Sequence, residues 1–248
     1  MTKSATREAL EDIELAVHSL SNATGKPRLA GERGREWWQF EKRSTDVVVV
    51  CKAVRVSSGL NAASALLDAG FVAEVGVLLR TVDDYVDEIT FLTESVESGE
   101  ESSAHKRFVE AFFAQRIMSR DELLEQENTE GYLPKKKIRA SQARQLGADN
   151  PDYVRKVTSV IDNTLDAFVH GHYPTAMELY HGGVHRFSLR GMPSTRNSSA
   201  MREQFAHYVY RALAVLGVYA ALRGMAEVAE SAKKAAKKYL SSGEYSLL

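Results

Sequence analysis

The segment Leu66–Leu92 constrains the fold most strongly, because it combines a helical apolar pattern with an internal arginine and several carboxylates. Val72, Leu79 and Val86 widen its apolar stripe to the face expected of a core helix. Asp68-Ala69-Gly70 has the pattern of a helix end followed by a tight turn. We therefore expect a buried central helix directly after this turn. The stripe repeats in steps of three and four, as one face of an α-helix requires: Phe71, Val75, Leu78, Val82, Tyr85, Ile89 and Leu92.

The opposite face of this helix is small and apolar at first and charged further on. Ala73, Gly76 and Val77 suggest that a second layer covers this side. Arg80 follows, and Asp84 stands four residues later, at the spacing of an ion pair along a helix. A covered Arg80 needs such a carboxylate, because an unpaired buried charge costs several kcal/mol. The pair is either structural or part of a polar site inside a bundle.

Helical patterns also run through the rest of the chain. Val47–Val50 would suit a strand by propensity, but no partner strand is evident elsewhere, so we assign it to a helix. Trp37 and Trp38 are expected to open this second helix, after a glycine-containing loop over Ser21–Gly34. We expect a single all-α domain over residues 1–248, an antiparallel helical bundle with a long C-terminal helix.

The last helix is expected to be unusually long. A continuous helix from about Ser199 to Leu240 would measure ~60 Å, which exceeds the length of a small bundle. We therefore expect the core to span about residues 36–222, and the helix end within 223–248 to project, fray or meet another subunit. Gly217 and Gly224 are seven residues apart and indicate a close approach by another helix.

Composition restricts the class of protein. The 248 residues include 32 basic and 33 acidic side chains, so a net charge of −1 gives no global attraction to nucleic acid or anionic membranes. A single cysteine, Cys51, fits a reducing compartment. The N-terminus lacks the apolar core of a signal peptide, and no apolar run approaches the ~20 residues of a membrane span. We expect a cytoplasmic protein with no membrane association.

The histidines are the first candidates for chemistry. Glu178 and His181 have the Glu-x-x-His spacing of di-metal bundles, but such sites need two copies and further glutamates, so no metal is expected. His170 precedes Gly171 at a helix end, where a histidine interacts well with the helix dipole. That helix end could also face Arg80 and Asp84. Four of the seven histidines fall within 16 residues: His170, His172, His181 and His185.

A second candidate lies near the start of the last helix. Arg202 and His207 are separated by four residues, and such a pair could bind a phosphate and move a proton near neutral pH. The plain alternative is a surface arginine and a half-buried helical histidine. The chain has no P-loop, dinucleotide-binding glycine motif, Cys-x-x-Cys pair or Gly-x-Ser-x-Gly motif, so no cofactor is expected.

The stretch ALLDAGFVAEVGVLLRTVDDYVDEITFL resembles a hallmark of uncharacterised bacterial all-helical proteins. They share Leu-Leu-Arg-x-x-x-acidic, usually with glutamate where Asp84 stands, and a later Val-His-Gly like Val169-His170-Gly171. The match covers roughly residues 45–172. The group is similar in outline to the HEPN superfamily of helical bundles, often dimeric and often found in toxin–antitoxin and phage-defence systems. In HEPN ribonucleases an Arg-x4-6-His motif cleaves RNA without metal; Arg202 and His207 fit its spacing, although Glu203 follows the arginine.

Three functions follow from these observations. The resemblance implies a homodimer that cleaves or binds RNA, with Arg80, Asp84 and His170 in a central polar site and Arg202 and His207 in a second. The alternatives are a non-enzymatic interaction protein, in which Arg80–Asp84 is structural, and a metal-binding bundle. An enzyme should bring at least two of Arg80, His170 and His207 into one open cleft.

Overall fold

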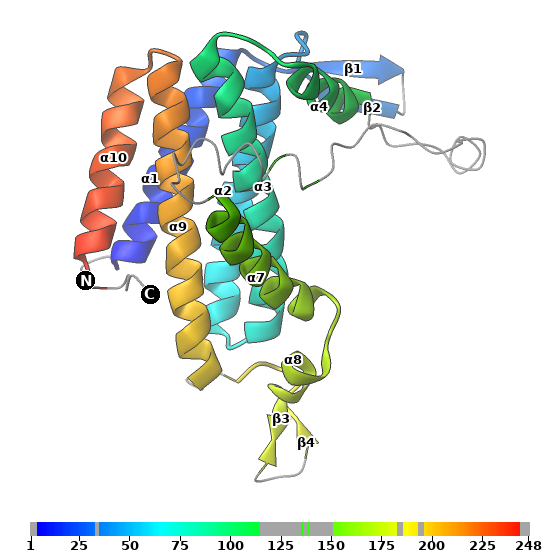
Figure 1. Cartoon of the computed structure of the whole chain (residues 1–248), viewed down its shortest axis with the longest axis vertical. Coiled ribbons are helices and arrows are strands. Elements are labelled where there is room, and N and C mark those ends of the chain that lie inside the picture. The colour runs from blue at the N-terminus through cyan, green and yellow to red at the C-terminus, as the bar shows by residue number, and fades with distance from the viewer. Residues whose placement is uncertain are drawn as a thin grey trace.

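The structure of the chain is a computed structural model. It describes residues 4–32, 35–114, 135, 138, 151–182, 186–192 and 196–243. The expected all-α bundle, with a long helix in its C-terminal part, is confirmed (Figure 1). The bundle helices are α1 (Ala5–Thr24), α2 (Thr45–Asp68), α3 (Val72–Ser98), α9 (Arg196–Leu222) and α10 (Ala226–Ser241). The chain between α3 and α9 carries α4 (Ser103–Ala114), α7 (Pro151–Val169) and α8 (Tyr173–Met177).

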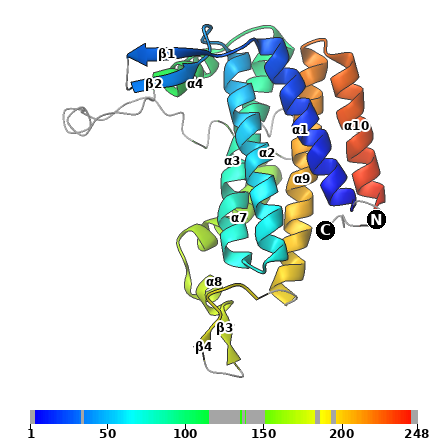
Figure 2. The ribbon, with the colours of Figure 1, turned by 180° about the vertical axis from the view of Figure 1, so that it is seen from behind.

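The bundle helices form a closed ring in the order α1, α2, α3, α9, α10 and back to α1. Helix α9 also contacts α1 and α2, so it touches every other helix of the ring. Figures 1 and 2 show that α1, α3 and α9 run in one direction and that α2 and α10 run in the other. The pair α3–α9 is therefore parallel, and a long connection must carry the chain from the end of α3 back to the start of α9.

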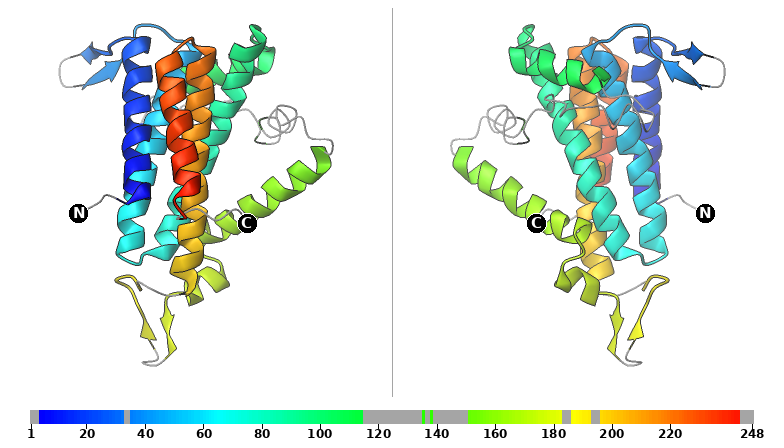
Figure 3. Two further views of the ribbon diagram at one scale, coloured as in Figure 1. Left: turned by 90° about the vertical axis from the view of Figure 1, so that its left-hand side faces the viewer. Right: turned by 90° about the vertical axis from the view of Figure 1, so that its right-hand side faces the viewer.

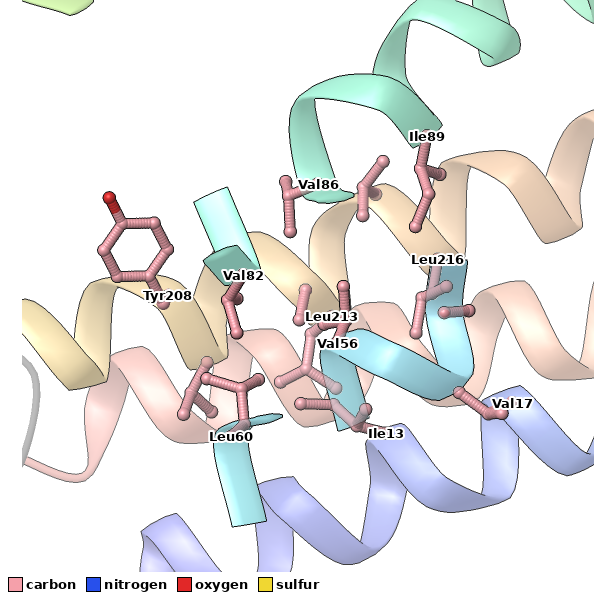
Figure 4. Close-up of a cluster of buried hydrophobic side chains, with 14 of the residues drawn as sticks. Ile13, Val17, Val56, Leu60, Val82, Val86, Ile89, Tyr208, Leu213 and Leu216 are labelled. Atoms are coloured by element: carbon pink, nitrogen blue, oxygen red, sulfur yellow. The ribbon is translucent and has the colours of Figure 1, made fainter. Parts of the chain in front are cut away.

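The core lies where α1, α2, α3 and α9 meet (Figure 4). The four valines of Val47–Val50 are all buried in α2, which confirms their assignment to a helix. Burial against neighbouring helices outweighs the strand preference of β-branched residues. The side chains that fill the centre of the bundle include Ile13, Val56, Leu60, Val82, Val86, Leu213 and Leu216.

The turn between α2 and α3 has the expected form. Gly70 has a φ of +80°, in the left-handed region that favours glycine. Its N–H donates to the Leu67 carbonyl at 3.1 Å, and the Phe71 N–H donates to the Leu66 carbonyl at 2.9 Å. This double hydrogen bond is the Schellman motif, which satisfies the last carbonyls of α2 and reverses the chain.

The expectation of one continuous helix from Ser199 to Leu240 is wrong, because a second Schellman motif ends α9 at Leu222. Gly224 has a φ of +71°, and the Met225 N–H donates to the Ala220 carbonyl at 2.9 Å. The following helix, α10, packs back against α9 and α1 instead of projecting. The close approach expected at Gly217 and Gly224 is confirmed at Gly217, where a Cβ would lie 3.2 Å from the Ala232 methyl group of α10, but not at Gly224, where a Cβ would meet no atom within 4 Å.

The expectation that Trp37 and Trp38 open the second helix is also wrong. They lie in β2 (Arg35–Gln39), which pairs with β1 (Arg28–Glu32) in an antiparallel hairpin that projects beside the top of the bundle (Figure 1). A second small hairpin, β3 (Tyr180–His181) with β4 (Arg186–Phe187), projects at the opposite end (Figure 3). Partner strands therefore do exist, but in short hairpins outside the helical core.

Within the described part of the chain, two helices have the length and apolar composition of a membrane span, α2 and residues 197–222 of α9. The core helices of globular bundles meet the same criterion, and 56% of each apolar window is buried against the rest of the protein.

Gly76 sets the contact between α3 and α7. A Cβ at this position would lie 2.9 Å from the Cβ of Phe168 and 2.7 Å from its ring carbon Cδ2. Glycine therefore allows Phe168 to pack directly on the backbone of α3. This contact covers the central helix at Gly76, as expected, but the expected cover does not extend to Val77, which is exposed.

We expect Gly76→Ala to destabilise the protein by about 1–3 kcal/mol, because the new methyl group overpacks the contact with Phe168. Alanine otherwise favours a helix by about 1 kcal/mol, so the expected loss is opposite to the helix propensity. Urea unfolding measures the difference in the free energy of unfolding. Gly182→Ala is the matched control, since a Cβ there meets no atom within 4 Å. Equal stability of Gly76→Ala and the wild type would contradict this packing.

Candidate functional site

Arg80 lies between α3 and α7 and binds two carboxylates. Its Nη1 lies 2.6 Å from Asp84 Oδ1, which confirms the pairing along the helix. Its Nε donates to Asp166 Oδ1 of α7 at 2.5 Å. Lys135 also binds Asp84. Burial opposes the charge of Arg80, but the two carboxylates raise its pKa above the ordinary value.

His170 lies close to this cluster in the chain but does not complete it. It follows the last residue of α7, and its backbone N–H donates to the carbonyl of Asp166 at 2.9 Å. Its side chain is exposed and stacks on the ring of His172, with the ring centroids 6.0 Å apart. Among the interactions of the described residues, those of Arg80 are with Asp84 and Asp166 and not with His170.

Arg202 binds the end of another helix. Its Nη2 donates to the Leu67 carbonyl at 3.2 Å, and its Nη1 pairs with Asp68 at 3.3 Å. A cation at a helix C-terminus is stabilised by the partial negative charge of the last carbonyls. The contact thus ties the start of α9 to the end of α2.

His207 lies on another side of α9. Five residues along an α-helix correspond to one full turn plus about 140°. Arg202 and His207 therefore point in different directions and do not share a helical face. Arg202 is exposed, and His207 is half-buried beside Arg211 and Asp83. Burial lowers the pKa of His207, the positive charge of Arg211 lowers it further, and Asp83 partly opposes both.

The most buried charges lie between α3 and α9, where Arg211 binds both Asp83 and Asp87. The distance from Arg211 Nη2 to Asp87 Oδ1 is 2.8 Å. The two carboxylate side chains are only 6% and 5% exposed. The ring of Tyr208 covers the guanidinium, with its centroid 5.3 Å from Arg211 Cζ.

A second buried pair joins α2 to α3. Lys52 Nζ lies 2.6 Å from Glu88 Oε2, and both side chains are almost fully buried. The ammonium also lies 4.9 Å from the ring centroid of Tyr85, within the range of a cation–π interaction. Sequence reasoning missed both Lys52 and Arg211. The sequence did contain a signal for these cations: four acidic residues lie within one and a half turns of α3. Buried carboxylates need cations from neighbouring helices.

The structure does not contain the helical arrangement of Glu178 and His181 on which the metal-binding alternative depends. Helix α8 ends at Met177, and His181 lies in β3, so Glu178 and His181 are not one helical turn apart. His185 lies outside the described residues. Within the described part of the chain, no group of three or more His, Cys, Asp or Glu side chains is placed to hold a metal ion.

Comparison with known proteins finds no family model, no curated protein and no solved structure that matches this chain.

We expect three arginine-to-methionine substitutions to lower the free energy of unfolding by different amounts. The loss should be greater where the carboxylates left without a partner are more buried. Arg211→Met should cost about 3–5 kcal/mol, because the buried carboxylates of Asp83 and Asp87 lose their partner. Arg80→Met should cost about 1–3 kcal/mol, since Asp84 and Asp166 are partly exposed. Arg202→Met should cost about 0–1 kcal/mol, as expected of an exposed pair.

The free energy of unfolding in urea measures all three variants, and Arg202→Met is the matched control on the same helix as Arg211. If Arg211→Met were as stable as Arg202→Met, the bridge between α3 and α9 would not be a determinant of stability.

We expect His207 to make the protein less stable in weak acid. Its pKa is lowered in the folded state, so below its ordinary value of 6.5 the unfolded chain binds more protons. Stability contributed by the neutral imidazole is fully present above pH 6.5 and falls as the pH drops from there toward the folded pKa. His207→Gln should flatten this part of a plot of unfolding free energy against pH. Equal slopes for wild type and His207→Gln would contradict the assignment.

Proposed function

We propose that this chain is a non-catalytic interaction protein, a cytoplasmic helical bundle that binds its partner without transforming it. The observation that carries this proposal is that the cations of the candidate sites already have structural partners. Arg80, whose side chain is only 14% exposed, binds Asp84 and Asp166, and a phosphate would have to displace both carboxylates. Arg202 also has partners, Asp68 and the Leu67 carbonyl, in a more exposed contact.

The arrangement of the candidate catalytic groups also supports this proposal. General acid–base cleavage requires the proton-transfer group and the phosphate-binding group to reach one substrate atom. His170 is exposed at the end of α7, and His207 lies beside Arg211 on α9. Arg80 is held by Asp84 and Asp166, and His207 lies on a different side of α9 from Arg202.

The similarity to HEPN bundles adds further elements to the proposal. It favours RNA as the ligand, a homodimer as the assembly and a defence- or toxin-type system as the setting. A metal-independent ribonuclease is the competing function, and one observation favours it. The lowered pKa of His207 keeps its imidazole neutral at pH 7, which is the form that a general base needs.

We expect the folded protein to leave total RNA and transfer RNA intact in the presence of a chelator. The measurement is gel analysis of RNA after incubation with equimolar protein, with His170→Ala and His207→Ala run beside the wild type. All three proteins should match the buffer control.

Cleavage that is lost in one of the histidine variants would overturn the proposal and identify a catalytic histidine. Circular dichroism of each variant ensures that lost cleavage does not reflect lost folding. Cleavage that persists in both variants would point to a contaminating nuclease, and a second purification that removes it would restore the proposed result.

A further inference from the structure

The β1–β2 hairpin exposes large aromatic side chains on both of its faces. Trp37 is 55% exposed and Trp38 is 71% exposed. Adjacent residues of a strand point to opposite faces, so each face of the hairpin carries one indole. Trp38 shares its face with its cross-strand partner Leu29, which is also exposed, and Trp37 shares the other face with Ala30.

Water-exposed indoles on a hairpin outside the core do not contribute to the packing of the bundle. Trp37 donates from Nε1 to Gln39 Oε1 at 3.2 Å along its own strand, which fixes the position of the ring at the surface. Figures 1 and 2 show the hairpin reaching sideways beyond the ends of the bundle helices. Both faces are therefore open to a ligand.

The segment around the hairpin is basic, unlike the chain as a whole. Residues 26–43 contain six basic and three acidic residues, within a protein whose net charge is −1. Lys26, Lys42 and Arg43 are exposed at the base of the hairpin. Arg28 pairs with Glu41 at 3.1 Å, but both side chains are about two-thirds exposed, so this surface pair is weak and can open.

A flexible anionic polymer with aromatic rings fits this combination best. Single-stranded nucleic acids bind proteins through stacking of bases on aromatic side chains and through cations that follow the phosphates. A lipid surface fits less well, because a hairpin enters a membrane tip first. Glu32 of β1 and Arg35 and Glu36 of β2 are charged and come first along the hairpin from its end, whereas the two tryptophans follow them in β2.

We propose that the β1–β2 hairpin is a binding site for single-stranded nucleic acid, in which Trp37 and Trp38 stack on bases and Lys26, Arg28, Lys42 and Arg43 contact phosphates. This inference rests on the proposed function as an interaction protein, and it names the class of partner and the surface that binds it. Lys52, Arg80 and Arg211 of the bundle take no part, because carboxylates already hold them.

The test uses intrinsic fluorescence, because both tryptophans of the chain lie in β2 and their emission reports on the hairpin alone. The ligand is a fluorescently labelled dodecamer of thymidine, single-stranded DNA that lacks the 2′-hydroxyl needed for metal-free cleavage. We expect quenching of the tryptophan emission and an increase in dodecamer anisotropy. The affinity should fall linearly with salt concentration on a double logarithmic scale.

Variants assign the contacts. Trp37→Ala and Trp38→Ala should each weaken binding by roughly 5- to 150-fold, the range for the loss of one stacked base. Leu15→Ala removes an equally exposed apolar side chain from α1 and should bind as the wild type does. Circular dichroism of all variants should be unchanged, because the replaced side chains lie outside the core.

The outcomes separate this inference from the proposed function. Cleavage of RNA with tryptophan-dependent binding of the dodecamer would overturn the non-catalytic function and leave the hairpin site standing. Intact RNA with no quenching by the dodecamer would overturn the hairpin site alone. Quenching by vesicles of phosphatidylcholine and phosphatidylserine, without quenching by the dodecamer, would overturn it in favour of a lipid surface.

Discussion

The ion bridge from Arg211 to Asp83 and Asp87 determines how the two halves of the bundle come together. Helices α2 and α3 form one antiparallel hairpin and α9 and α10 form another, each closed by a local glycine turn. Apolar contacts alone would tolerate sliding of one hairpin along the other, because hydrophobic burial is not directional. A half-buried arginine that binds two buried carboxylates one turn apart has one satisfactory register, and any shift leaves the carboxylates buried without a partner.

Local patterns were the part of this fold that sequence reasoning could recover. The apolar repeat of α3 and the turn at Gly70 depend only on neighbouring residues, and both were predicted correctly. The break at Gly224 depends on the same kind of signal and was missed. Gly224-Met225-Ala226-Glu227 resembles Gly70-Phe71-Val72-Ala73-Glu74, a glycine and an apolar residue before an acidic first turn. The apolar spacing on either side of Gly224 concealed the reversal.

Contacts between distant segments were beyond the reach of a single sequence. The Arg80–Asp84 pair follows from a spacing of four, but Asp166 is 86 residues from Arg80, and nothing in either segment indicates the other. Arg211 and Lys52 were missed for the same reason. The positions of the two tryptophans were predicted wrongly because the prediction followed a general rule, that large aromatic residues usually lie in a core. Here the core is filled by aliphatic side chains, by phenylalanines and by the buried tyrosines Tyr208, Tyr219 and Tyr239, and not by tryptophan.

The parallel arrangement of α3 and α9 has a consequence for the time course of folding. Each helical hairpin is made of contacts between neighbours in the chain and can form within microseconds to milliseconds. The seam between them joins residues 128 positions apart, from Asp83 to Arg211, so it closes only after a long loop has been gathered. Loop entropy grows slowly, at about 0.6 kcal/mol for each doubling of length. The entropy cost of closing this seam therefore depends little on the length of the connection, and α7 within it is held to α3 by the contacts of Gly76 and Arg80.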